Sequence, residues 1–123
     1  MQCPKCLADM EVIDYNGIEI DRCTDCYGLF FDHMEKESLK DLKGAESIDI
    51  GDEFVGATLN EILDVPCPKC KIKMAHVFQQ EPFEIKFESC PKCHGAYFDA
   101  GEFRDYMDDE VYDSFQDVLE TLD

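Results

Sequence analysis

The sequence predicts a small α+β fold dominated by metal: two tandem four-cysteine zinc ribbons, each a β-hairpin followed by a helix, and an amphipathic helix at the C-terminal end. Three observations support this prediction. All eight cysteines of the 123-residue chain lie in Cys-x-x-Cys pairs. The four pairs form two blocks, with hairpin-sized inserts of 16 and 19 residues between the pairs of a block. A helix-start pattern follows each block.

Each block supplies four thiolates at the spacing of a structural zinc site, which predicts two zinc ions per chain. No cysteine is left over to serve as a nucleophile, and no catalytic residue is predicted. Disulfides are the alternative use of eight cysteines. Cys3 follows the start too closely for a signal peptide, so we expect a cytoplasmic location, where thiols stay reduced. The predicted metal ligands are Cys3, Cys6, Cys23, Cys26, Cys67, Cys70, Cys90 and Cys93.

The chain divides into four predicted segments. These are a first ribbon with its helix (1–44), an acidic spacer with a short helix (45–66), a second ribbon with its helix (67–108) and an acidic amphipathic helix (109–123). Units below about 40 residues rarely fold without a metal or disulfides. Structural zinc contributes roughly 10–16 kcal/mol to the folding of such a unit. We therefore expect a substitution of Cys26 or Cys93 to affect mainly its own ribbon.

The two blocks repeat one unit, which supports gene duplication. Gly28 and Gly95 each lie two residues after the last cysteine of a block, where they allow a positive φ or a close backbone approach. Asn16-Gly17 separates two partly alternating runs, 10–14 and 18–21, and predicts a tight hairpin. A second hairpin is predicted from runs 74–79 and 83–88.

A helix should follow each ribbon. Asp32 with Glu35 and Asp99 with Glu102 form capping-box patterns, which predict helices over about 33–42 and 101–107. Gly44 is a good terminating residue for the first helix. Acid–base chemistry is the alternative role of these carboxylates, and we favour capping because their offsets fit helix starts.

Apolar residues outside the ligands mark three further features. The aromatic pairs Phe30-Phe31 and Tyr97-Phe98 predict a small core under each zinc, with base stacking as the alternative. The spacer predicts a short helix with an apolar face, formed by Phe54, Val55, Leu59, Ile62 and Leu63. The C-terminal segment carries an apolar helical stripe, which either packs within the chain or binds a partner or a second copy. The stripe includes Val111, Phe115, Val118 and Leu122.

The formal charge of −18 becomes −22 when each four-thiolate zinc site adds two negative charges. Such a chain repels nucleic-acid phosphates over most of its surface. Ten of the acids lie from Asp99 onward, with Arg104 as the one base there. One basic region interrupts this acidic surface near Cys67 and Cys70, formed by Lys69, Lys71 and Lys73. Any contact with nucleic acid is expected there.

The apolar stretches are too short to span a membrane. His94 directly follows Cys93 and is a candidate substitute ligand, although four cysteines already suffice.

The motifs CPKC…CTDCYGLFFDHME and CPKC…CPKCHGAYFDAGE resemble the bacterial TFIIB-like zinc-finger family, whose ribbons are named after a general transcription factor. The resemblance covers about residues 3–40 and 67–105. It implies zinc on the eight cysteines, a β-hairpin ribbon with a following helix, and a link to transcription. The sequence departs from the family pattern at two places, and neither involves a cysteine ligand. His33-Met34 replaces the usual x-Gly before Glu35, and Phe or Tyr stands where Trp is common.

Four functions compete at this stage. The favoured one is a non-enzymatic adapter whose acidic surface and apolar helix dock a protein with a basic surface. The second is nucleic-acid binding through Lys69, Lys71 and Lys73. The third is a rubredoxin-like electron carrier with iron in place of zinc. The fourth is an oxidoreductase that uses the Cys-x-x-Cys pairs, whose thiolates structural zinc would occupy.

Overall fold

The fold was obtained as a computed structural model, which describes residues 1–33, 35–40, 42, 44–59, 61–62, 65–79 and 85–107. The strands are β1 (Met10–Tyr15), β2 (Ile18–Cys23), β3 (Leu29–Phe31), β4 (Ala75–Gln79), β5 (Ile85–Ser89) and β6 (Ala96–Phe98). The helices are α1 (Glu35–Lys40), α2 (Glu53–Leu59), α3 (Glu102–Tyr106) and the 3-10 helix η1 (Ala45–Ile48). The predicted C-terminal helix over 109–123 lies outside the described residues. Every described helix is too short or too polar to cross a lipid bilayer.

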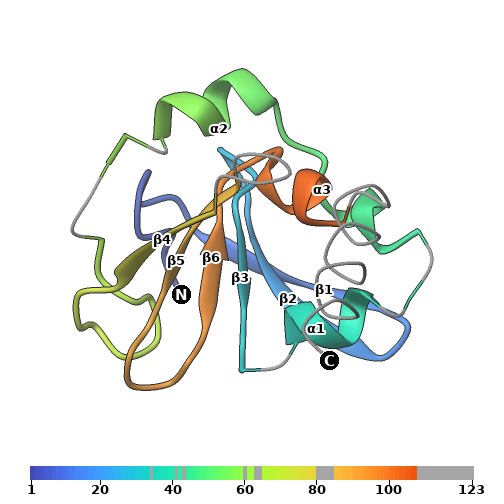
Figure 1. The fold of residues 1–123 in the computed structure, drawn as a ribbon, viewed down its shortest axis with the longest axis horizontal. Helices are drawn as coiled ribbons and strands as arrows, with labels where there is room; N and C mark the ends of the chain where they lie inside the picture. The colour runs from blue at the N-terminus through green and yellow to red at the C-terminus, as the bar shows by residue number, and fades with distance from the viewer. Residues whose placement is uncertain are drawn as a thin grey trace, which may run out of the picture.

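The strands of both ribbons form one antiparallel sheet with the order β1-β2-β3-β6-β5-β4 (Figure 1). Each ribbon contributes three strands, and the ribbons meet where β3 pairs with β6. In that central pair Phe30 lies opposite Tyr97, and Phe31 lies opposite Ala96. The aromatic runs that predict a local core under each zinc are therefore the central strands of a shared sheet.

The predicted first hairpin is confirmed, with β1 and β2 registered from Met10 opposite Cys23 to Tyr15 opposite Ile18. Asn16 and Gly17 have φ values of 52° and 88°. Positive φ at both central residues is the requirement of a type I′ turn, whose twist matches that of the flanking strands. The second hairpin also forms, between β4 and β5, with residues 80–84 of its turn outside the described part of the chain.

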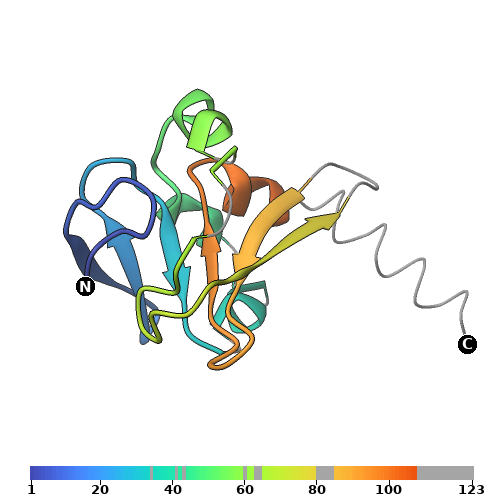
Figure 2. The same ribbon diagram turned by 90° about the vertical axis from the view of Figure 1, so that its left-hand side faces the viewer.

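The two faces of the sheet have different coverings. On one face the central strands bury Phe31 and Phe98 against Leu39 of α1, Ile48 of η1 and Phe103 of α3. Phe31 and Phe103 lie with ring centroids 4.8 Å apart. The opposite face carries Phe30 and Tyr97 together with the cysteines of both blocks. In Figures 1 and 2, α2 and α1 lie near opposite ends of the central strands.

The predicted spacer helix exists as α2, and part of its apolar face is exposed to solvent. The side chains of Phe54 and Val55 are 76% and 44% exposed. Gly56 is the buried residue of this helix. A Cβ on Gly56 would lie 1.9 Å from the carbonyl oxygen of Ala100, so only glycine permits this approach. The helix thus contacts the second ribbon through its backbone.

The predicted capping boxes are realised differently at the two helices. At α1, the backbone N–H of Asp32 donates to Glu35 Oε1, as the pattern predicts. At α3 the prediction is wrong, because the Asp99 carboxylate pairs with Lys5 instead. The carboxylate of Asp49, from the spacer, accepts hydrogen bonds from the N–H groups of Gly101 and Arg104 at 3.0 Å. An acid distant in sequence therefore caps α3 and fixes the spacer to the second ribbon.

Candidate metal centres

Each Cys-x-x-Cys pair forms a turn that ends on a residue with positive φ. These residues are Leu7 (67°), Tyr27 (61°), Lys71 (65°) and His94 (61°). In three of the turns the N–H of this residue returns to the carbonyl of the first cysteine, at 2.8–3.1 Å. Backbone N–H groups then point at the sulfurs, as in the 3.3 Å bond from Cys70 N to Cys67 Sγ. Such amides stabilise thiolate charge at a metal site.

The structure gathers the eight predicted ligands into two groups of four. One group contains Cys3, Cys6, Cys23 and Cys26, and the other contains Cys67, Cys70, Cys90 and Cys93; within each, all sulfurs lie within 4.8 Å of one another. The separations include 3.7 Å for Cys3–Cys26, 3.3 Å for Cys6–Cys23 and 3.8 Å for Cys67–Cys93. Tetrahedral zinc with Zn–S bonds of about 2.3 Å requires sulfurs about 3.8 Å apart. The two four-cysteine groups therefore fit two zinc ions.

Two thiols of the first group have pKa values shifted in opposite directions by their mutual hydrogen bond. The side-chain hydrogen bond from Cys26 lowers the pKa of Cys3 to about 4, and the same contact raises the pKa of Cys26. Both shifts favour negative charge on the sulfur of Cys3 rather than on that of Cys26. Zinc would replace the remaining protons, which couples metal affinity to pH.

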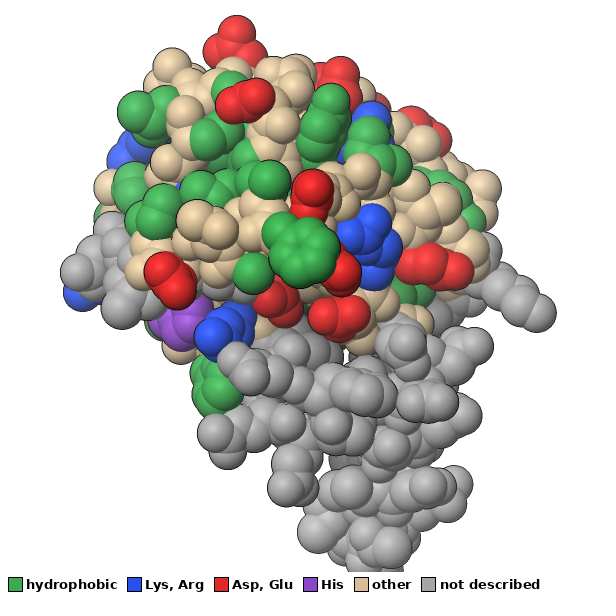
Figure 3. All heavy atoms as spheres, turned by 90° about the horizontal axis from the view of Figure 1, so that it is seen from above, with side chains coloured by type: hydrophobic (Ala, Val, Ile, Leu, Met, Phe, Trp, Pro, Cys, Tyr) green, Lys and Arg blue, Asp and Glu red, His purple; other side chains and the backbone are tan. Residues whose placement is uncertain are grey.

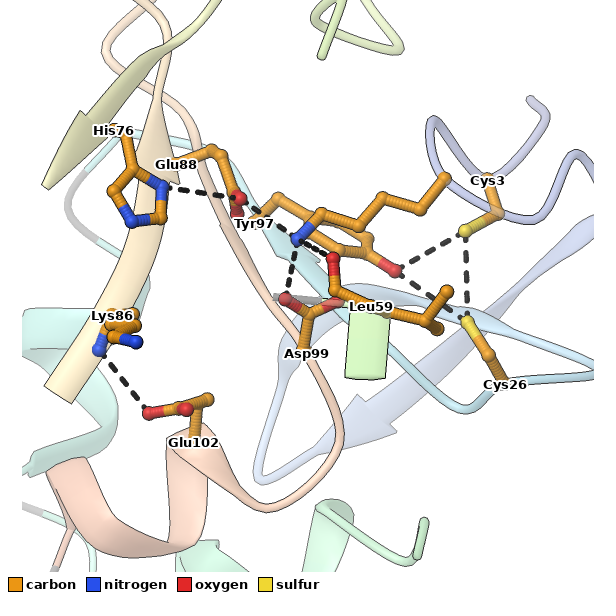
Figure 4. Close-up of polar contacts among 10 residues, drawn as sticks. Cys3, Cys26, Leu59, His76, Lys86, Glu88, Tyr97, Asp99 and Glu102 are labelled. Carbon is orange, nitrogen blue, oxygen red and sulfur yellow. Dashed lines mark hydrogen bonds and ion pairs between the residues drawn. The ribbon is translucent and has the colours of Figure 1, made fainter. Parts of the chain in front are cut away.

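Tyr97 of the second ribbon reaches the first metal group. Its hydroxyl oxygen lies 3.2 Å from Cys3 Sγ and 3.6 Å from Cys26 Sγ, with the ring fully buried (Figure 4). Burial raises the pKa of Tyr97, so the group stays protonated and can donate to a thiolate. No local sequence pattern indicates this role, because Tyr97 lies 71 residues after Cys26.

The glycines after the last cysteine of each block make room for an aromatic ring of the other ribbon. A Cβ on Gly28 would lie 2.0 Å from the hydroxyl oxygen of Tyr97, and one on Gly95 would lie 2.5 Å from Cζ of Phe30. Neither glycine is among the residues with positive φ. Of the two predicted roles of these glycines, the close approach is therefore the observed one.

A buried charged cluster joins the ribbons beside Tyr97. Lys5 Nζ lies 2.8 Å from Glu88 Oε1 and 2.5 Å from Asp99 Oδ2, and all three side chains are at most 2% exposed. The ammonium group also donates to the carbonyl of Leu59 at 3.1 Å and lies 5.6 Å from the Tyr97 ring centroid. Figure 4 shows Glu88 and Asp99 on the side of Tyr97 away from the sulfurs. Burial raises the pKa of Asp99 to about 7 and also raises that of Glu88.

The repeat places a second lysine–carboxylate pair at the equivalent position, but on the surface. Lys69 Nζ lies 3.0 Å from Asp32 Oδ1, and both side chains are about half exposed. This hydrogen bond raises the pKa of Lys69 and pairs its charge within the chain. The charge of Lys69, the first lysine of the predicted basic patch, is therefore paired with Asp32.

The histidines contribute no ligand to the two groups. His94 and His33 are exposed, and their ring centroids lie 5.3 Å apart. His76 Nδ1 lies 3.6 Å from Glu88 Oε1 at the edge of the buried cluster. Since four sulfurs gather without it, His94 is not needed as a ligand.

Comparison with known proteins agrees with this geometry. The profile of the family described as "Transcription factor zinc-finger", a zinc ribbon of the TFIIB type, matches residues 2–42 and 66–109. Each matched segment contains one group of four cysteines, its hairpin and the following helix. No curated protein and no solved structure shows a significant match.

Proposed function

This chain belongs to the transcription factor zinc-finger family, and we propose that it is a non-enzymatic, zinc-stabilised adapter that binds a protein partner. The observation that carries the proposal is an apolar surface left exposed on the spacer and on Tyr27 beside it, next to carboxylates. We call it the α2 surface; it consists of Tyr27 (36% exposed), Ile50 (53%), Phe54 (76%) and Val55 (44%).

The α2 surface is rigidly held, which suits a docking site. The spacer is fixed to α3 by Asp49 and by Arg104, whose guanidinium donates to the carbonyls of Asp49 and Gly51 at 3.1 and 2.8 Å. A backbone that is already fixed loses little further conformational freedom when the side chains it carries bind a partner. The side chain of Phe54 is 76% exposed, so most of its apolar area is not buried by the described part of the chain.

The charge of the surface supports a basic partner. Asp25, Asp52 and Glu53 adjoin the apolar residues in sequence, and all three are exposed. Figure 3 looks onto this end of the molecule and shows hydrophobic side chains interspersed with many carboxylates and few Lys or Arg. A partner with an apolar anchor and a basic rim complements such a surface, and the formal charge of −18 speeds its approach.

The test is a quantitative affinity purification with zinc-loaded protein, at low and at high salt. Phe54→Asp should abolish recovery of the specific partner, whereas the matched control Val12→Asp, at a 63%-exposed position on β1, should leave it unchanged. Recovery should also fall as salt rises, because exposed charges are screened. The α2 surface would be refuted as the docking site if both variants recovered equal amounts of the partner. It would also be refuted if the amount recovered did not depend on salt concentration.

The predicted stripe of Val111, Phe115, Val118 and Leu122 is the other docking candidate and lies outside the described residues. Phe115→Asp in the same experiment separates the two candidates, and the mass in solution reports self-association. A role in transcription and a cytoplasmic location are expectations of this proposal. Nucleic-acid binding is less supported, because Lys69 is already paired with Asp32. A rubredoxin-like carrier would be recognised by iron in the native protein.

A further inference from the structure

We propose that Tyr97 makes the two metal sites unequal: the first site retains its zinc, and the second is the site that exchanges zinc and reacts first with thiol-directed electrophiles. The inference concerns the metal sites and does not depend on the adapter function. It starts from the position of the one tyrosine hydroxyl, among the described residues, that contacts ligand sulfurs across the ribbon interface.

The first step is the hydrogen bond itself. Tyr97 Oη lies within 3.6 Å of two sulfurs, Cys3 and Cys26, which come from different Cys-x-x-Cys turns of the first site. A donor to a metal-bound thiolate withdraws charge from sulfur, which lowers its tendency to accept a proton or to attack an electrophile. Loss of such an outer-shell partner typically costs about 10–100-fold in metal affinity.

The second step is the repeat. Phe30 occupies the position equivalent to Tyr97, opposite it in the central strand pair and against Gly95 as Tyr97 lies against Gly28. Phenylalanine has no hydroxyl, so this ring cannot donate to the second site. Within the described part of the chain, the hydrogen bonds found for the second-site sulfurs come from backbone N–H groups, such as Gly95 N to Cys93 Sγ at 3.4 Å, or from neighbouring cysteines.

The third step is access. In the first site only Cys6 is partly exposed, whereas in the second site both Cys70 and Cys93 are. An attacking group therefore meets two partly exposed cysteines in the site that lacks the hydroxyl. Both differences favour earlier reaction at the second site.

The experiment follows alkylation of the zinc-loaded protein by N-ethylmaleimide, a neutral reagent that the nearby lysines do not attract. Peptide mass spectrometry assigns the modification rate of each cysteine, and a chromogenic indicator follows released zinc. In the wild type, the second-site cysteines should react at least about tenfold faster than those of the first site, with half of the zinc released in the fast phase.

Two variants test the cause. Tyr97→Phe should accelerate the first site by about tenfold and leave the second unchanged. Phe30→Tyr should slow the second site, since it places a hydroxyl at the equivalent position. In the cobalt-substituted protein, Tyr97→Phe should move the sulfur-to-cobalt charge-transfer band to lower energy, because the thiolates lose a donor.

Three results would overturn the proposal. Equal rates at both sites in the wild type would show that the hydroxyl does not distinguish them. An equal acceleration of both sites by Tyr97→Phe would show that the residue acts only on overall stability. If Tyr97→Phe does not fold, an unchanged second-site rate in folded Phe30→Tyr would refute the mechanism by itself.

Discussion

Replacing Lys5 by methionine should strongly destabilise the protein, although the change keeps the length of the side chain. Lys5 is the cation of the buried cluster, and its removal leaves the carboxylates of Glu88 and Asp99 with side-chain exposures of 2% and 0%. Removing one partner of a buried ion pair typically costs about 3–5 kcal/mol, because the remaining charge is desolvated and uncompensated. We expect a loss in that range.

The repeat supplies a matched control in Lys69→Met. Lys69 makes the equivalent contact with Asp32, but the two side chains are 53% and 50% exposed. Exposed pairs contribute only about 0–1 kcal/mol, so this variant should be nearly neutral. Both free energies of unfolding would be measured by urea titration, with circular dichroism as the signal and free zinc held constant.

The pH dependence provides a second readout. A carboxyl whose pKa is raised in the folded state binds more protons there than in the unfolded chain, so stability falls as pH rises through the window. For Asp99 this window runs from the ordinary value of 3.8 to about 7. Loss of Lys5 raises the upper limit further, so Lys5→Met should cost more at pH 8 than at pH 6. A cost below about 1 kcal/mol at pH 8, or equal costs for both lysine variants, would refute this reasoning.

Three further predictions concern the metal, the ribbon interface and nucleic acid. Metal analysis should give two zinc ions per chain, and a chelator should abolish the β-sheet signal in circular dichroism, because the metal supplies folding energy. Gly28→Ala should cost about 1–3 kcal/mol in urea titration, because the new Cβ would lie 2.0 Å from Tyr97 Oη; a neutral result would show that the interface relaxes freely. Binding to duplex DNA at about 0.15 M salt should be weaker than micromolar by fluorescence anisotropy; tighter binding that Lys69→Gln, Lys71→Gln and Lys73→Gln together abolish would favour the nucleic-acid alternative.

The features that depend on local spacing could be predicted from the sequence. The Cys-x-x-Cys spacing alone indicates which cysteines form each metal-binding group. Asn16-Gly17 determines the turn of its hairpin, because both residues readily adopt the positive φ that the turn requires. The helix over α1 follows from Asp32 and Glu35, which lie within one turn of each other. In each case the interacting groups are close in sequence, so no knowledge of the tertiary fold is needed.

The features that join the ribbons could not be predicted in this way. Lys5 and Asp99 are 94 residues apart, and Asp49 caps a helix that begins 53 residues later. Nothing in their local patterns distinguishes Lys5 from Lys69, or Asp99 from Asp32, because the repeat gives both pairs the same motif. Only the pairing of β3 with β6 brings the members together, and that pairing depends on short apolar runs whose partners the sequence does not indicate.

The single spacer contacts the two halves of the repeat unequally. A tandem repeat that pairs β3 with β6 produces two equivalent lysine–carboxylate contacts, one on each side of the central strands. One spacer joins the two copies, and it contacts the first of these positions, where the Leu59 carbonyl accepts a hydrogen bond from Lys5. The Lys5 position is buried, so each charge there needs a partner of opposite charge within the protein. Its counterpart at Lys69 and Asp32 is solvent-exposed, so losing one of these charges costs little stability. The same covered side contains the Tyr97 hydroxyl and the more enclosed group of four cysteines. The spacer contact, the Tyr97 hydroxyl and the more enclosed group of four cysteines therefore all lie on the side of the first metal site.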